Sequence, residues 1–136
     1  MKRHILSDCL KIVNKTLTKH PVYSLDVSSH YMHWSFIIQF NRLIKWGINR
    51  NGSPPIYLGH NRRINFAKAK IHSELDAWRK AKSILSDKPF ECVNIRVNKS
   101  GQLKLSKPCI CCEAFLESVG CTRVIFSTES GFCEAF

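Results

Sequence analysis

Two short segments of the sequence carry side chains whose types and spacing suit metal chemistry. They are residues 72–74, His-Ser-Glu, and residues 108–112, Pro-Cys-Ile-Cys-Cys. Cys109 and Cys112 are three residues apart, so they face the same way if this segment opens a helix. One imidazole and two thiolates supply three ligands of a tetrahedral zinc site and leave the fourth position open for water. The partial positive charge of a helix N-terminus also favours the thiolate form of cysteine.

A carboxylate stands beside the imidazole of the first segment. Zinc lowers the pKa of a bound water to about 7, so hydroxide is available at neutral pH. Glu74 is too close to His72 in the chain to be a convenient fourth ligand. It is well placed to take a proton from the water and to return it to a substrate. The sequence thus predicts a hydrolytic zinc centre with Glu74 as its catalytic acid–base.

Each residue also has an interpretation without catalysis. Taken alone, His72 could be a surface or capping histidine, and Glu74 could be an acid that suits the helix dipole. Cys111 could compete as a ligand, although a packed thiol fits it better. The joint spacing of the two segments favours the metal site. The remaining cysteines are expected to be core thiols, although Cys133 in a terminal strand could be exposed: Cys9, Cys92, Cys121 and Cys133.

The elements that must position these segments follow from the apolar pattern. Residues 4–19 repeat apolar side chains at three- and four-residue steps, which predicts an amphipathic helix that ends before Pro21. Residues 33–40 and 43–48 predict a hairpin with its turn at Asn41-Arg42. Glycines and prolines predict a loop over residues 49–64.

The second half of the chain alternates helices and strands. The elements expected are a helix from about residue 64 to Asp87, a strand over 90–97, a turn over 98–101, a return strand over 102–105, a helix from Pro108 to Gly120 and a strand over 122–127. This order predicts a three-layer α/β fold with helices covering a mixed sheet. A parallel crossover needs about a dozen residues, so a last strand after Gly131 would be antiparallel.

Composition and charge narrow the class of protein. The chain has 136 residues, 44% of them hydrophobic and 23% charged, which suits one folded domain and excludes a disordered chain. No apolar run reaches the roughly 18 residues of a membrane span, and the N-terminus lacks the apolar centre of a secretory signal. We therefore expect a cytoplasmic protein with reduced cysteines. Residues 1–73 hold 12 basic and 2 acidic side chains, a field that attracts polyanions.

The two motifs together resemble a known group of enzymes. His-x-Glu followed by Pro-Cys-x-x-Cys is similar to the pattern of the zinc-dependent cytidine and deoxycytidylate deaminase superfamily, which includes nucleic-acid base deaminases. The resemblance covers residues 33–128 and implies the cytidine-deaminase-like fold, with four to five strands. It implies that one Zn²⁺ is held by His72, Cys109 and Cys112. It also implies that Glu74 shuttles protons while hydroxide attacks an amino-bearing ring carbon.

A third match concerns the substrate. Residues 47–50, Gly-Ile-Asn-Arg, resemble the family's Gly-x-Asn, which implies that Asn49 anchors the nucleoside and that the Ser73 N–H lies over the base. Aromatic side chains that flank this loop could stack on a base, and they are Trp46, Tyr57 and His60. Arg62 and Arg63 could contact phosphate or could be plain solvated charge.

The sequence departs from the family pattern in two places. The 37 residues from His72 to Cys109 exceed the gap of compact members, and the turn over 98–101 accounts for the surplus. An antiparallel last strand resembles the cytidine and toxin-like deaminases and differs from the tRNA-adenosine and APOBEC-like branch. This difference favours cytosine over adenine as the base.

Three functions remain. The first is deamination of cytosine to uracil in single-stranded DNA or RNA, which the basic half of the chain favours. The second is deamination of free cytidine, deoxycytidine or a nucleotide, with the charge serving phosphate capture or solubility. The third is a non-catalytic nucleic-acid-binding protein with structural zinc. All three describe one domain over residues 1–136, with an N-terminal helix at 4–19 and no membrane contact. The oligomeric state is left open.

Overall fold

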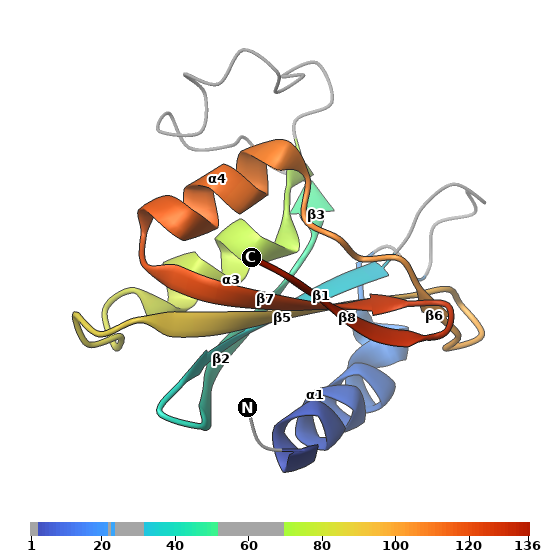
Figure 1. The fold of residues 1–136 in the computed structure, drawn as a ribbon. Helices are drawn as coiled ribbons and strands as arrows, with labels where there is room; N and C mark the ends of the chain where they lie inside the picture. The colour runs from blue at the N-terminus through green and yellow to red at the C-terminus, as the bar shows by residue number, and fades with distance from the viewer. Residues whose placement is uncertain (1–2, 22, 24–31, 52–69) are drawn as a thin grey trace.

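The fold is built around a mixed β-sheet with helices on both faces (Figure 1). The structure, a computed structural model, describes residues 3–21, 23, 32–51 and 70–136. Its elements are α1 (Arg3–Thr16), the 3-10 turn η1 (Leu17–Lys19), β1 (Met32–Gln39), β2 (Arg42–Ile48), β3 (Arg50–Asn51), β4 (Lys70–Ile71), α3 (Ser73–Ala81), β5 (Phe90–Val97), β6 (Leu103–Lys104), α4 (Ile110–Ser118), β7 (Cys121–Thr128) and β8 (Gly131–Ala135). Across these residues, no helix combines the length and the hydropathy that a membrane crossing requires.

The main sheet has six strands, in the order β2-β1-β5-β7-β8 with β6 beside β5. β1 is antiparallel to β2 and β5, β5 is parallel to β7, and β7 is antiparallel to β8. The predicted mixed sheet and the antiparallel last strand are therefore confirmed. The sheet exceeds the expected four to five strands because the short return strand, β6, pairs with the end of β5.

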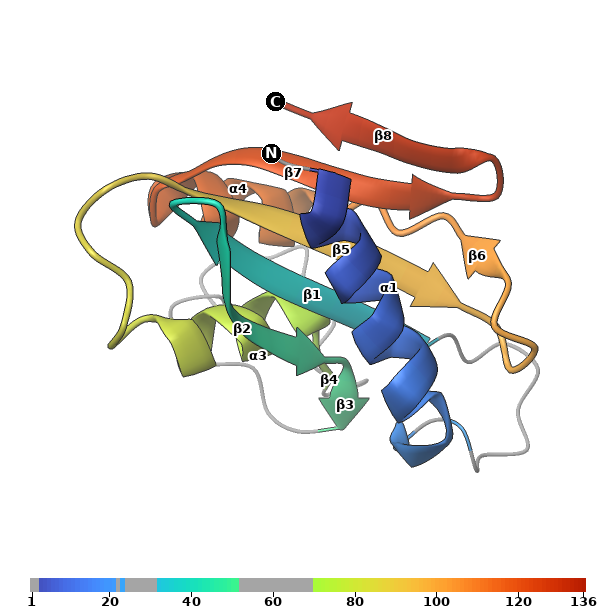
Figure 2. The ribbon, with the colours of Figure 1, turned by 90° about the horizontal axis from the view of Figure 1, so that it is seen from below.

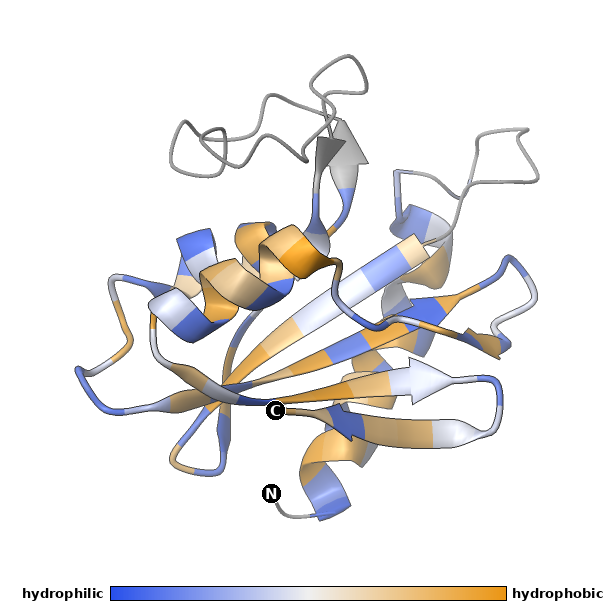
Figure 3. Ribbon diagram, turned by 45° about the horizontal axis from the view of Figure 1, so that its top comes forward, coloured by the Kyte–Doolittle hydropathy of each residue, from blue (hydrophilic) through white to orange (hydrophobic). Residues whose placement is uncertain are grey.

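Apolar side chains fill the space between the three layers. α1 lies on one face of the sheet, and α3 and α4 lie on the other (Figures 1 and 2). The buried set on the α1 face includes Ile5, Cys9, Val13, Trp34 and Phe36. The buried set on the other face includes Ile37, Ala77, Cys92, Leu116 and Val124. Apolar residues recur along the central strands that the helices cover (Figure 3). With helices on both faces of the sheet, the predicted three-layer α/β architecture is confirmed.

Several predicted boundaries agree with the structure. β5 has the predicted bounds, and α1 with η1 covers the predicted N-terminal helix. Gly120 has a φ of 104°, the left-handed conformation expected after a helix. The first hairpin turns one residue earlier than predicted. Phe40 and Asn41 have φ values of 53° and 56°, which are the positive values that a two-residue type I′ turn requires.

The middle helix differs most from its prediction. The sequence predicts a helix from about residue 64 to Asp87, whereas α3 spans only Ser73–Ala81. Directly before it, Lys70–Ile71 pair with Arg50–Asn51 as a two-stranded antiparallel sheet, so the predicted loop and helix are both wrong at these positions. This pairing joins residues far apart in the sequence, which local periodicity does not report. The rest of the predicted loop and the helix start lie outside the described residues.

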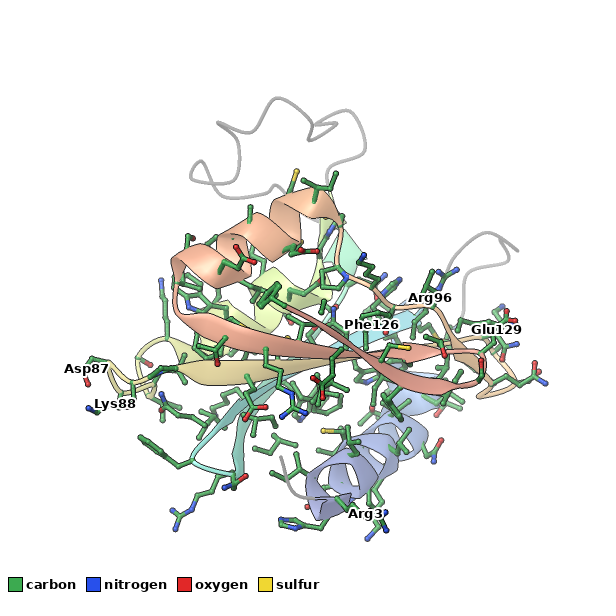
Figure 4. The ribbon with its side chains drawn as sticks, in the orientation of Figure 1. Arg3, Asp87, Lys88, Arg96, Phe126 and Glu129 are labelled. Atoms are coloured by element: carbon green, nitrogen blue, oxygen red, sulfur yellow. The ribbon has the colours of Figure 1, made fainter. Side chains whose placement is uncertain are left out.

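A buried amide holds the connection between α3 and β5. Gln39 accepts a hydrogen bond from the backbone N–H of Ser86 at 3.1 Å and donates to the carbonyl of Lys88 at 2.8 Å. The connection over residues 86–89 is therefore held by the β1 side chain and not by helical hydrogen bonds. Asp87 and Lys88 in this connection lie at the opposite end of the sheet from Arg96 (Figure 4).

Gly47 lets α3 approach β2 closely. A Cβ atom at this position would lie 2.3 Å from the backbone nitrogen of Ala77. Next to it, the backbone N–H of Ile48 donates to Asp76 Oδ2 at 3.0 Å, and Asp76 is buried within α3. The helix that follows His72 is therefore seated directly on the backbone of β2.

We predict that Gly47→Ala lowers the free energy of unfolding by about 3 kcal/mol or more, because backbone atoms and not a flexible side chain occupy the space. Urea denaturation measures the change. Lys45→Ala, an exposed change on the same strand, is the control and should stay within about 0.5 kcal/mol of the parent. A Gly47→Ala protein as stable as this control would contradict the close contact.

Candidate metal centre and active site

Three ligand atoms meet where α3 and α4 begin. His72 is the N-cap residue of α3 and Cys109 the N-cap residue of α4, both with extended backbone. His72 Nδ1 lies 3.6 Å from Cys109 Sγ and 3.3 Å from Cys112 Sγ. All three ligand atoms lie within 4.8 Å of one another, and no other such group occurs among the described residues. The structure thus brings together the three predicted ligands.

The spacing of these atoms fits tetrahedral zinc. With Zn–S bonds of about 2.3 Å and Zn–N bonds of about 2.0–2.1 Å, a tetrahedron separates nitrogen from sulfur by about 3.6 Å. The two observed distances, 3.6 and 3.3 Å, are close to this value. Cys112 is buried while His72 and Cys109 are exposed, so the cluster has an open side. Three ligands and an open side are typical of catalytic zinc sites.

The two thiols of the cluster differ in acidity. The pKa of Cys109 is lowered to about 4, chiefly by the hydrogen bond from the Cys112 thiol and also by His72 and the Cys112 backbone N–H. The pKa of Cys112 is raised, because its thiol donates to Cys109 and because it is buried. Without metal, Cys109 is therefore the thiolate at neutral pH. Metal binding would release the proton of Cys112.

Glu74 lies in the first turn of α3, two residues after His72, and is 5% exposed. Ser73 Oγ donates to its Oε1 and Asn94 Nδ2 donates to its Oε2, both at 3.2 Å. Burial is the main cause that raises the pKa of this carboxyl. A carboxylate whose pKa is raised is a stronger proton acceptor than an ordinary glutamate, which suits a general base.

Ser73 and Asn49, both predicted to contact substrate, border this site. The Ser73 hydroxyl is buried and lies 2.7 Å from Ser35 Oγ, so this side chain belongs to the protein interior. Asn49 follows β2, and its Oδ1 accepts from the backbone N–H of His33 at 2.8 Å. The charge of His72 is among the causes that lower the pKa of His33, so the start of β1, to which Asn49 bonds, lies near the cluster.

Trp46, another predicted substrate contact, is not brought to the cluster. Trp46 packs with the core residues under α1, where its ring lies 6.5 Å from that of Phe36. Arg62 and Arg63 lie outside the described residues, as do Tyr57 and His60. Cys111 is half-buried and does not belong to the ligand group.

Sequence reasoning missed two polar residues beneath the site. Ser35 is in the middle of β1, Asn94 is in the middle of β5, and both are buried. The sequence feature that could have identified them is a single polar residue between apolar neighbours in a strand, as in Val93-Asn94-Ile95. A buried polar group needs partners, so such a position marks a contact that another segment must supply.

Known structures share this architecture. The chain is similar to the dCMP deaminase from the cyanophage S-TIM5 in complex with dCMP and dUMP, with a TM-score of 0.57 and 17% identity over 93% of this chain and 82% of that one. It is also similar to the cytidine deaminase from Mycobacterium leprae, with a TM-score of 0.54 and 14% identity over 91% of each chain. The corresponding values for cytidine deaminase from Mycobacterium tuberculosis are 0.52 and 12%, over 90% of this chain and 86% of that one.

No family model matches the sequence, and no curated protein matches it either. The structural likeness shows that the chain has the cytidine-deaminase-like fold. The predicted fold is therefore confirmed.

We predict that the purified protein binds one zinc ion per chain and that Cys112→Ser removes most of it. The site joins α3 to α4, so loss of the ion should also lower the melting temperature. Metal analysis and thermal unfolding measure the two effects. Cys111→Ser is the matched control and should keep its zinc. Full zinc in Cys112→Ser would instead indicate that Cys111 is the ligand.

We predict that His33 makes stability depend on pH. Burial, and then the charges of Arg96, His72 and His20, lower the pKa of His33 to about 3 in the folded chain. The unfolded chain takes up this proton near pH 6.5. Between these values the unfolded state binds more protons, so the free energy of unfolding falls as the pH is lowered.

His33→Asn should remove this contribution. From pH 7.5 to pH 5, the parent should lose up to about 2 kcal/mol more than the variant, at about 1.4 kcal/mol for each pH unit below 6.5. Urea denaturation at the two pH values measures the difference. His4→Asn, at an exposed position of α1, should behave like the parent. Equal losses in parent and His33→Asn would contradict the assignment.

Proposed function

We propose that residues 1–136 form one deaminase domain that uses zinc to convert cytosine to uracil in single-stranded DNA or RNA. The observation that carries this proposal is a buried carboxylate, Glu74, beside a group of one imidazole and two thiols with an open side. An open three-ligand site suits hydrolysis. The carboxylate supplies the proton transfers that removal of an amino group requires.

In the proposed reaction, the described side chains hold the ion and move protons. His72, Cys109 and Cys112 would hold zinc, which when bound would supply hydroxide at neutral pH. Glu74 would accept a proton from the attacking water and pass it to the pyrimidine and its leaving amino group. Water is consumed and ammonia is released. Burial of Glu74 keeps bulk water from competing for that proton.

The substrate contacts are proposed from the position of two residues. Asn49 follows β2, accepts from the His33 N–H and also forms a side-chain hydrogen bond with His20. Its place beside the sugar or base is proposed from the family resemblance of the Gly-x-Asn segment. Ser73 has its hydroxyl in the interior, so a contact with the base would come from its backbone N–H.

Two features support cytosine and a nucleic-acid strand. β8 is antiparallel to β7, the arrangement of the cytidine-deaminase branch that the sequence resembles. The first 73 residues carry most of the net charge of +11. Lys107, two residues before Cys109, is exposed. We propose that this charge binds phosphates, with Arg62 and Arg63 among the contacts.

Deamination of a free cytosine nucleoside or nucleotide is a second candidate. The fold likeness to a dCMP deaminase and to two cytidine deaminases favours it. A non-catalytic zinc protein that binds nucleic acid ranks below both. It offers no reason for a buried carboxylate beside an open three-ligand site.

One panel of substrates tests the proposal. Zinc-loaded protein is incubated with single-stranded DNA, RNA, cytidine, deoxycytidine and dCMP, and with the matching adenine compounds. Mass spectrometry then records the shift from amino to carbonyl. Turnover of cytosine in a strand supports the first candidate, and turnover of the free compounds alone supports the second. A full complement of zinc without deamination on any compound would refute both.

Salt separates the two candidates further. Binding to a single strand should weaken with salt, with a slope of log K against log salt of about −0.7 for each phosphate neutralised. Arg62→Ala with Arg63→Ala should reduce this slope and weaken binding to all sequences alike, because backbone contacts carry no base information. Affinity for strands that does not depend on salt would remove the reason to prefer a strand.

We predict that Glu74→Ala keeps zinc and fold but lowers kcat by at least about 10²–10⁴-fold, the usual contribution of a general acid–base. Metal analysis, circular dichroism and the deamination rate measure the three properties. Glu117→Ala, an exposed acid on α4, is the control and should keep full activity. Activity of Glu74→Ala within tenfold of the parent would show that another group moves the proton.

A further inference from the structure

A buried amide lies directly against the carboxylate of Glu74. Asn94, in the middle of β5, is 2% exposed. Its Nδ2 donates to Glu74 Oε2 at 3.2 Å and to the Ser106 carbonyl at 3.3 Å. Its Oδ1 accepts from Ser35 Oγ at 2.7 Å and from Cys92 Sγ at 3.4 Å. An asparagine amide has two donor hydrogens and two acceptor positions, so all four are used.

These partners determine which way the amide faces. Rotating it by 180° would bring Oδ1 against Glu74 Oε2 and the Ser106 carbonyl, two contacts between acceptors. The Ser106 carbonyl can only accept, so it holds the NH₂ group on the side that faces Glu74.

The same amide links Glu74 to the loop that carries a metal ligand. Ser106 is three residues before Cys109; its carbonyl accepts from the Asn94 amide, and its hydroxyl donates to the backbone carbonyl of Asn94 at 2.8 Å. Ser73 Oγ holds the second carboxylate oxygen, Oε1, at 3.2 Å. The Glu74 carboxylate is thus held at both oxygens, and Asn94 relates its position to the strand and to the loop before α4.

We propose that Asn94 is a positioning residue that aims the Glu74 carboxylate at the metal cluster. Its kinetic consequence rests on the deaminase function proposed above. The bonds of the Asn94 side chain go to Glu74, Ser106, Ser35 and Cys92 and not to the three ligand residues, so we expect its effect on the reaction to pass through Glu74. A displacement of about 1 Å at a catalytic group can cost about 10²-fold in rate, so the loss of this contact should appear in kcat.

The first test replaces the amide by an apolar side chain of similar size. Asn94→Leu should keep zinc and lower kcat by roughly 10–100-fold, with KM changed less than about threefold. Gln39→Leu is the matched control, because it removes another buried amide at the far end of β1. It should cost stability but leave the kcat of folded protein unchanged. A kcat of Asn94→Leu within threefold of the parent would overturn the proposal.

A double variant separates positioning from a general loss of structure. If Asn94 acts through Glu74, then adding Asn94→Leu to Glu74→Ala should cause no further loss of residual activity, because the two changes are not independent. An equal loss in both backgrounds would show a structural role and overturn the proposal. If Asn94→Leu does not fold, Ser35→Ala decides, with an expected loss of kcat of roughly 3–10-fold through the freed amide.

Crystal structures of zinc-loaded parent and Asn94→Leu make the inference independent of the reaction. The Glu74 carboxylate should occupy one position in the parent and a shifted or divided position in the variant. If the parent deaminates nothing, the proposed function fails, yet a shifted Glu74 still supports positioning by Asn94. A Glu74 side chain that stays in place in the variant would overturn the inference whatever the activity.

Discussion

The close approach of the N-terminal ends of α3 and α4 is the constraint on which the site depends. His72 and Cys109 are both N-cap residues, so their ligand atoms meet only if the two helices begin side by side. Gly47 lets α3 lie on the backbone of β2. Trp78 of α3 and Phe115 of α4 meet edge to face, with ring centroids 5.0 Å apart, a geometry that aromatic pairs favour.

The sheet supplies the chemistry as well as the support. β1 and β5 are among the most buried strands, yet each places one polar side chain, Ser35 and Asn94, beneath Glu74. Buried polar groups cost stability unless they are hydrogen-bonded, and here each bonds to another. This arrangement buries the Glu74 carboxylate, which raises its pKa. Hydrogen bonds to Ser73 and Asn94 fix its position.

Charge and fold bear on different parts of the proposed function. The basic first half of the chain attracts phosphates, whereas the fold is shared with enzymes named for a free nucleotide and a free nucleoside. Both are cytosine compounds attached to a sugar. The proposed chemistry at Glu74 is the same for either, so the charged surface and not the metal cluster would decide between them.

The sequence by itself determined the local features of this protein and the types of residue at its centre. The strand over 90–97, the left-handed Gly120 and the antiparallel last strand follow from short-range rules, and the structure confirms them. It also brings together His72, Cys109 and Cys112, as the motif spacing predicts. Only the tertiary structure decided where α3 begins and ends, which face of the sheet Trp46 occupies, and that Asn94 holds Glu74. Each of these depends on contacts between segments far apart in the chain. The apolar periodicity of one segment does not indicate which other segments it contacts.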